Sequence, residues 1–354
     1  MIRLGATGRF AAAGRWPLAA VLCGSLALLA CGGGKNNTAA GAKAPAKAPA
    51  ATQAAAATPD LAGPACPPGG SLRPVIASSE LVTGPNRFTI GILDRQCTPI
   101  PDAKVHLKFF ELVGQAQGNQ AQGTLRFEAD ATFRSPGREA GLPAVETVTR
   151  PDGTRISVAS GGDDVGIYEA QVAFDKAGNW GVEADVTGAD AVHSGVVRTP
   201  FTVLAQSTTP AIGSPAPRSQ NLTVKDDPQF KLIDTSAHPS ADMHTETVAE
   251  AIAQHHPTLV LFATPGYCTS RLCGPELELA RKLEPKYQGK ADFIHIEIYK
   301  NPQTKELMPA VEEWRLQTEP WFFVVDKNGN VAAKFEGPTT LEEIDAALTK
   351  VTAG

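Results

Sequence analysis

Residues 258–280 read TLVLFATPGYCTSRLCGPELELA, and this stretch decides the fold. The apolar run at residues 259–263 is typical of a buried strand, and the Pro-Gly pair after it predicts a turn. Pro275 predicts the first turn of a helix, where its missing N–H leaves no hydrogen bond unmade. Cys268 and Cys273 are therefore expected at a helix N-terminus. The partial positive charge there favours the thiolate, which is the nucleophilic form of cysteine.

The residues on either side continue an alternation of helices and strands. Thr245 is expected to cap a helix that ends before Pro257, and Asn301 to cap another that is interrupted at Pro309. The expected order is αβαβαββα. Its helices are predicted at residues 245–253, 275–284, from 301 onward and 340–351, and its strands at residues 259–263, 292–299, 321–325 and 331–335.

A second motif, TEPWFFVVDKNG at residues 318–329, precedes the last expected hairpin. Together with the thiol motif and the element order, it resembles the thioredoxin fold over residues 221–354. In that family a cis-proline lies against the thiol pair, and Pro320 occupies the matching position. The resemblance implies an α/β thioredoxin fold and thiol-disulfide exchange with protein thiols or disulfides. The implied site residues are Cys268, Cys273 and Pro320.

The spacing of the thiols departs from thioredoxins, which place two residues between their cysteines where this chain has four. On a regular helix, positions five apart are roughly 8 Å apart, beyond the limit of about 7 Å between the Cα atoms of a disulfide. Either Cys268 lies in the loop and folds back, or the first helical turn unwinds on oxidation. We favour Cys268 as the attacking thiol, because aligning Cys273-Gly-Pro-Glu276 with the thioredoxin Cys-Gly-Pro-Cys leaves Cys273 without a partner.

Three other functions are compatible with the motif. It is similar to the loop of bacterioferritin-comigratory peroxiredoxins, although Tyr267 is inserted and Glu319-Pro320 stands where those enzymes place an arginine. It also resembles the copper chaperones of cytochrome oxidase assembly, whose thiolates suit Cu(I), but residues 316–323 contain no histidine ligand. The third alternative is a non-catalytic binding module with a static disulfide.

The region at residues 66–205 is rich in strand signals. Short runs of alternating or β-branched residues recur between turns, at residues 87–93, 104–110, 155–159, 166–174, 180–186 and 196–203. Residues 99–102 and 175–179 are expected to form hairpin turns, which favours an antiparallel β-sandwich. Residues 86–94, 101–105 and 168–180 resemble the immunoglobulin-like domains of the YtkA-like type.

The N-terminal residues indicate export. A basic segment, an apolar run at residues 18–30 and the sequence Leu-Leu-Ala-Cys31 resemble a bacterial lipoprotein signal, so residues 1–30 are expected to be removed and Cys31 to carry lipid. Residues 31–65 are rich in alanine and proline and are expected to form a tether. The predicted location is the bacterial cell envelope, on the extracytoplasmic side of a membrane.

Four cysteines remain after Cys23 and Cys31 are set aside. An even number in an oxidising compartment predicts two disulfides, and Cys66 and Cys97 are expected to form the structural one. His106 and His193 are isolated, so we assign no metal and no cofactor.

Residues 206–220 are rich in proline and predict a linker that holds the two domains apart. The net charge is −5, and no basic cluster follows the signal, so nucleic acid is not expected as a partner. The chain is therefore expected to contain an all-β immunoglobulin-like sandwich followed by a thioredoxin fold.

The expected lipid anchor yields a first prediction. Replacing Cys31 with alanine should block processing or release the protein from membranes, because several acyl chains hold a protein far more firmly than one. Membrane fractionation and intact mass measure this outcome. An unmodified N-terminus at another residue in the wild-type protein would contradict the prediction.

Overall fold

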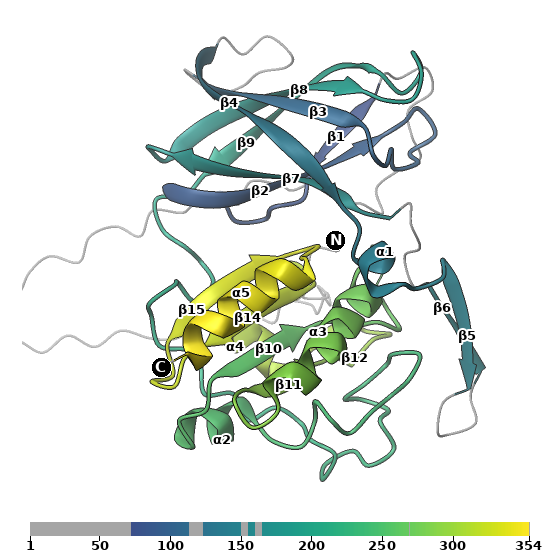
Figure 1. The fold of residues 1–354 in the computed structure, drawn as a ribbon, viewed down its shortest axis with the longest axis vertical. Helices are drawn as coiled ribbons and strands as arrows, with labels where there is room; N and C mark the ends of the chain where they lie inside the picture. Colours follow the sequence, from purple (N-terminus) through teal and green to yellow (C-terminus); the bar gives the residue numbers. More distant parts are fainter. Residues whose placement is uncertain (1–71, 113–122, 150–154, 160–164, 269, 354) are drawn as a thin grey trace, which may run out of the picture. The chain divides into compact units, whose positions relative to one another are not determined.

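A computed structural model describes residues 72–112, 123–149, 155–159, 165–268 and 270–353. Cys31, where lipid attachment is expected, the expected tether at residues 31–65 and Cys66 lie outside this range. The described residues form a sheet-rich N-terminal region and a C-terminal region of helices and strands (Figure 1).

Seven strands of the N-terminal region form one antiparallel sheet in the order β1-β2-β7-β4-β3-β8-β9. Their bounds are β1 Arg73–Ile76, β2 Gly84–Leu93, β3 Lys104–Leu112, β4 Gly123–Arg134, β7 Ile167–Phe174, β8 Gly178–Thr187 and β9 Gly195–Val203. Strand β4 pairs with β3 along most of its length and with β7 at its end, and so joins the two halves of the sheet. A short helix, α1 (Pro136–Ala140), follows β4, and β5 (Val145–Thr149) pairs separately with β6 (Arg155–Ala159).

The sheet encloses an aromatic core. Alternate residues of β3 are buried, and Phe109 among them packs edge-on against Phe88 with ring centres 4.9 Å apart. Phe174 and Trp180 pack in the same way at 5.0 Å. Each such ring buries a large apolar area, and together with the aliphatic side chains around them the rings stabilise the domain.

The six strands expected from the sequence are present, but two expected hairpins are wrong. Residues 99–102 lie between β2 and β3, and residues 175–177 connect β7 to β8, which begins at Gly178, yet neither pair of strands is adjacent in the sheet. Turn residues specify that the chain reverses and leave open which strands then pair. Strand β4 was not expected, although its apolar residues alternate from Leu125 to Phe133.

The C-terminal region has the predicted order αβαβαββα. Its main elements are α2 Val248–Ala253, β10 Thr258–Phe262, α3 Cys273–Tyr287, β11 Asp292–Ile296, α4 Pro309–Glu313, β14 Trp321–Val325, β15 Val331–Glu336 and α5 Leu341–Thr352. The sheet order is β11-β10-β14-β15, with β10 parallel to β11 and antiparallel to β14.

Helices cover both faces of this four-stranded sheet. Side chains of α3 and α5 pack on the face that carries Leu259 and Leu261, and Figure 1 draws these two helices in front of the strands. Side chains of α2 and α4 pack on the opposite face, with Val260 and Phe262. Strand β10 is buried at every position, which explains why it reads as an unbroken apolar run.

Two details of this region differ from the sequence prediction. The cap of α2 is Thr247 rather than Thr245, because Thr247 and Glu250 form a capping box. Asn301 does not start a helix. It ends β12 (Tyr299–Asn301), which pairs with β13 (Glu306–Leu307), and its side chain accepts hydrogen bonds from the next turn, an arrangement that resembles a helix cap in sequence.

The predicted linker, residues 206–220, is packed rather than a free spacer. The backbone N–H of Thr208 donates to the Glu80 carboxylate at 2.6 Å, and Lys334 forms an ion pair with the same carboxylate. Burial alone would raise the pKa of Glu80, but Lys334 and nearby hydroxyl groups lower it to about 2. Ser214 accepts a backbone hydrogen bond from Val331 at 2.9 Å. The domain boundaries on either side of this segment remain predictions.

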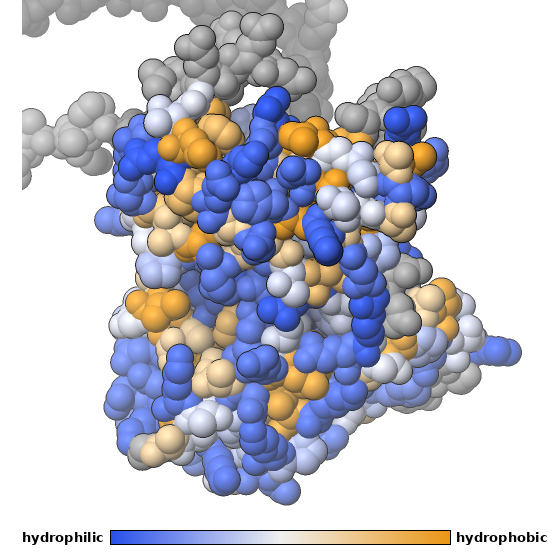
Figure 2. All heavy atoms as spheres, turned by 45° about the horizontal axis from the view of Figure 1, so that its top comes forward, coloured by the Kyte–Doolittle hydropathy of each residue, from blue (hydrophilic) through white to orange (hydrophobic). Residues whose placement is uncertain are grey.

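Hydrophilic residues dominate the face drawn in Figure 2, where hydrophobic residues form small separate groups. None of the helices within the described ranges is both long and apolar enough to cross a membrane.

The β-sheet core yields a second prediction. Leu107 is fully buried and Leu125 is 45% exposed. Leu107→Ala should lower the free energy of unfolding by about 2–5 kcal/mol, because it removes buried methyl groups and leaves a cavity. Leu125→Ala is the matched control and should change it by less than about 0.5 kcal/mol. Urea denaturation followed by circular dichroism measures both values, and equal losses would contradict this assignment of the core.

Candidate active site

The site is assembled where β10 ends and α3 begins. The intervening loop lies against residue Thr235, whose side-chain oxygen accepts a hydrogen bond of 2.8 Å from the N–H of Gly266. A Cβ atom at Gly266 would lie 2.8 Å from the Thr235 carbonyl oxygen, so only glycine permits this approach. The turn that the Pro-Gly pair predicts is thus fixed before the first cysteine.

Cys268 lies in the loop and folds back onto the start of the helix. Cys273 is the first residue of α3, and its backbone N–H donates to the Cys268 sulfur at 3.4 Å. The Ser270 hydroxyl lies 3.1 Å from the same sulfur. Of the two geometries that the sequence left open, the structure has the first, in which no helical turn has to unwind.

Both cysteines are free thiols, and their surroundings differ. Burial alone would raise the pKa of Cys268, but hydrogen bonds from Cys273 and Ser270 hold this pKa below its ordinary value. Burial, the Cys268 sulfur and Glu319 raise the pKa of Cys273 well above its ordinary value. Cys268 is partly exposed and Cys273 is fully buried. The pair therefore consists of one acidic, partly exposed thiol and one neutral, buried thiol.

Glu319 completes the site, although its sequence position predicted no role for it. It is fully buried, and neither carboxylate oxygen has a hydrogen-bond partner among the described residues. A carboxylate oxygen of Glu319 and the two sulfurs all lie within 4.8 Å of one another. Burial, followed by the charge of Cys268, raises the pKa of Glu319 well above its ordinary value. A neutral carboxylic acid beside a thiolate is a proton donor in position.

The signal for Glu319 was present in the sequence as an acidic residue directly before Pro320. The peptide bond between Glu319 and Pro320 is cis. The same three groups, Cys268, Cys273 and Glu319, form a set of potential metal ligands, of which only the two thiolates are soft.

Glu276 occupies the position of the second thioredoxin cysteine in the alternative alignment. It is fully buried, and its carboxylate accepts a hydrogen bond of 2.7 Å from the N–H of Thr339. Burial raises the pKa of Glu276 well above its ordinary value. This carboxyl group connects α3 to the residues before α5.

The other predicted residues are placed as follows. Cys97 is disulfide-bonded, and its pairing with Cys66 stays a prediction, since Cys66 lies outside the described residues. The side chain of Arg271, between the thiols, is exposed. His106 is not isolated, because it lies 2.7 Å from Asp130 and 2.9 Å from Glu128.

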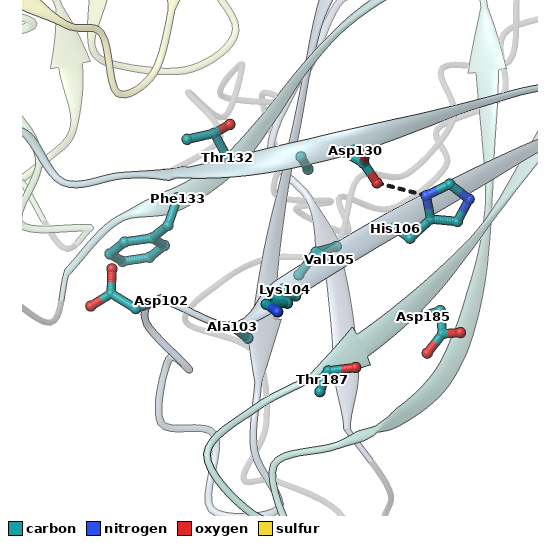
Figure 3. A pocket seen from close by; sticks show the side chains of 11 residues that line it. Asp102, Ala103, Lys104, Val105, His106, Asp130, Thr132, Phe133, Asp185 and Thr187 are labelled. Atoms are coloured by element: carbon teal, nitrogen blue, oxygen red, sulfur yellow. Dashed lines mark hydrogen bonds and ion pairs between the residues drawn. The ribbon is translucent and has the colours of Figure 1, made fainter.

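A depression of about 610 Å³ lies on the β-sheet region, far from the thiols in sequence and built on other strands. Figure 3 shows its lining, which includes Asp102, His106 and Asp130. These polar groups are already engaged, His106 with Asp130 and Asp102 with Arg138 at 2.9 Å. We assign no chemistry to this depression.

A family model and several solved structures are similar to parts of this chain. A family model described as a thioredoxin-like domain matches residues 245–352. A thiol:disulfide interchange protein of the thioredoxin family from Chlorobium tepidum TLS is 15% identical, and the match covers 42% of this chain and 99% of that one with a TM-score of 0.29. A thio-disulfide isomerase from Thermus thermophilus is 19% identical, with coverages of 34% and 89% and a TM-score of 0.22. No curated protein matches the chain.

The C-terminal region is therefore a thioredoxin-like domain, as the sequence analysis predicted. It follows a sheet-rich domain within the same chain. The function is inferred from the geometry of the site.

The buried carboxyl group yields a third prediction. A carboxyl whose pKa is raised on folding stabilises the folded state less and less as pH rises above its ordinary value of 4.5. Glu319→Gln removes this ionisation, so the melting temperature of the variant relative to wild type should increase between pH 4 and pH 8.

Thermal melts of the reduced protein at both pH values measure this change. Glu312→Gln, at an exposed position on α4, is the control and should show no such increase. An equal or smaller relative melting temperature of Glu319→Gln at pH 8 would show that Glu319 is ionised in the folded protein.

Proposed function

We propose that this chain is a lipid-anchored, extracytoplasmic thiol-disulfide oxidoreductase in which Cys268 attacks and Cys273 resolves. The observation that carries the proposal is the hydrogen bond of 3.4 Å from the first N–H of α3 to the Cys268 sulfur. An N–H at a helix start stabilises a negative charge, and a thiolate at such a position is a nucleophile at neutral pH. Its substrates are disulfides of other envelope proteins.

In the first step the Cys268 thiolate attacks one sulfur of the partner's disulfide. A bond forms between Cys268 and that sulfur, the partner's S–S bond breaks, and the other partner sulfur leaves as a thiolate. The neutral Glu319 carboxyl group gives its proton to the leaving thiolate. Formation of the S–S bond removes the negative charge of Cys268. Because that charge is one of the causes that raise the pKa of Glu319, Glu319 then gives up its proton more readily.

In the second step Glu319 acts as a base. Its carboxylate takes the proton of Cys273, and the resulting thiolate attacks the Cys268 sulfur of the mixed disulfide. A Cys268–Cys273 disulfide forms, and the second partner sulfur leaves and takes a proton from solvent. Two electrons pass from the thiol pair to the partner's disulfide, and the Glu319 carboxyl group returns to its neutral form.

The location rests on the N-terminal sequence and on the cysteines. A lipoprotein signal ending at Cys31 and a disulfide-bonded Cys97 both suit an oxidising compartment outside the cytoplasm. Within this proposal residues 66–205 are an immunoglobulin-like domain that presents the thioredoxin-like domain, at residues 221–354, to its partners. Residues 1–30 are the signal, residues 31–65 the tether and residues 206–220 the connection between the two domains.

The mechanism yields a fourth prediction. Cys268→Ser should abolish reduction of a disulfide substrate, since the attacking sulfur is gone. Cys273→Ser should accumulate a mixed disulfide with the substrate, because no thiol remains to resolve it. Ser270→Ala is a milder variant that removes one hydrogen bond to the Cys268 sulfur and should only slow the attack.

Non-reducing gels and mass spectrometry detect the mixed disulfide, and an insulin reduction assay gives the rate. Consumption of hydrogen peroxide serves as the control, because a peroxidase would form sulfenic acid at Cys268. If both cysteine variants match wild type in both assays, the pair is structural and the domain is a binding module.

A further inference from the structure

A second cluster of titratable side chains lies in the thioredoxin-like domain and takes no part in the thiol chemistry. It consists of Asp234 and His244, from the segment before α2, and His295 on β11. All three are at most 1% exposed. One potential ligand atom from each lies within 4.8 Å of the other two. Residues this polar are rarely buried together without a shared partner.

The hydrogen bonds of the two histidines leave their facing nitrogens without a proton. The Nδ1 atom of His244 lies 2.8 Å from the carbonyl oxygen of Ser240, and the Nε2 atom of His295 lies 3.2 Å from that of Ala263. A carbonyl oxygen only accepts, so each of these nitrogens carries the proton of its neutral ring. The remaining nitrogens, Nε2 of His244 and Nδ1 of His295, face each other at 3.1 Å with two lone pairs.

Two lone pairs that face each other repel, so a proton or a metal cation is needed between the two nitrogens. A shared proton would bridge only the two nitrogens, whereas a metal ion would also bind the Asp234 carboxylate beside them. A metal ion meets the same need without a proton. Two ligand nitrogens on a tetrahedral zinc ion are about 3.3 Å apart for Zn–N bonds of about 2.0–2.1 Å, close to the observed separation.

The carboxylate of Asp234 is also positioned to bind a cation. One oxygen accepts from the N–H of Ser236 at 2.9 Å, and the other accepts from the N–H of Ser240 at 3.0 Å and from Arg281. A carboxylate has about four lone-pair sites, so one remains for an ion. Arg281 also pairs with Glu278 at 2.6 Å, and Asp234, Arg281 and Glu278 together carry one negative charge that favours a cation.

We propose that Asp234, His244 and His295 form a binding site for a divalent transition-metal ion, with zinc as the best fit. Two imidazole nitrogens and one carboxylate oxygen are ligands that zinc takes readily, with a fourth position for water. The outer nitrogens bound to backbone carbonyls and the hydrogen-bonded carboxylate are the outer contacts typical of metal ligands in proteins.

The position of the site suggests what the ion does. Residues 205–247 contain no helix or strand longer than an isolated bridge, and such long irregular segments need anchoring. The ion would attach this segment to β11, directly beside Thr235, which supports Gly266 of the thiol loop. The ion would therefore hold Thr235 in place, and Thr235 in turn contacts the thiol loop at Gly266.

The test uses the full chain in detergent, with Cys268→Ser and Cys273→Ser combined so that the thiols cannot bind the metal. The protein is stripped with a chelator and titrated with zinc chloride alone. We expect one equivalent to bind and the melting temperature to rise. His244→Gln or His295→Gln should lower the zinc affinity at least tenfold, since changes even to outer contacts cost about 10–100-fold.

His256→Gln is the matched control, because His256 is exposed and contacts Asp292, and this variant should bind zinc normally. X-ray absorption of the zinc-loaded thiol-free protein needs no histidine variant and should show two imidazole ligands. The proposal is wrong if the thiol-free protein binds no zinc, if both histidine variants bind as tightly as their parent, or if the absorption spectrum shows no imidazole ligand. In each case the two rings share a proton instead.

Discussion

Helix α3 begins without a side chain that caps it, and the chemistry of the thiol site depends on this start. The residue before it, Leu272, makes no capping hydrogen bond, so the first N–H groups of the helix need other partners. The Cys268 sulfur accepts from one of them, that of Cys273. This contact joins the loop to the helix and places the Cys268 sulfur in the positive field of the helix end, while Cys273 stays buried.

The longer spacing of the two cysteines follows from the same contact. With four residues between them, Cys268 lies before the helix and can turn back toward its end, a geometry closed to two residues fixed five apart on a regular helix. Arg271 and Leu272 lie in the segment that turns back toward the helix, and the backbone of Arg271 is left-handed. The spacing that separates this motif from thioredoxins is therefore what brings its two sulfurs together.

Two buried carboxyl groups near the helix start illustrate how the surroundings decide a role. Glu276 and Glu319 are both fully buried, and burial raises the pKa of both. Glu276 accepts a backbone N–H and thereby connects two elements. Glu319 has no hydrogen-bond partner among the described residues and lies beside both sulfurs, so it is the one that remains available for proton transfer.

The sequence by itself determined the thioredoxin-like element order, the buried central strand and the placement of the thiols at a helix start. These features depend on local periodicity and on residues close together in the chain, which a sequence displays directly. Only the tertiary structure decided which β-strands pair, that Glu319 reaches the thiols, and that His244 and His295 face each other. Each of these is a contact between residues far apart in the chain, and no local pattern specifies the packing that brings them together.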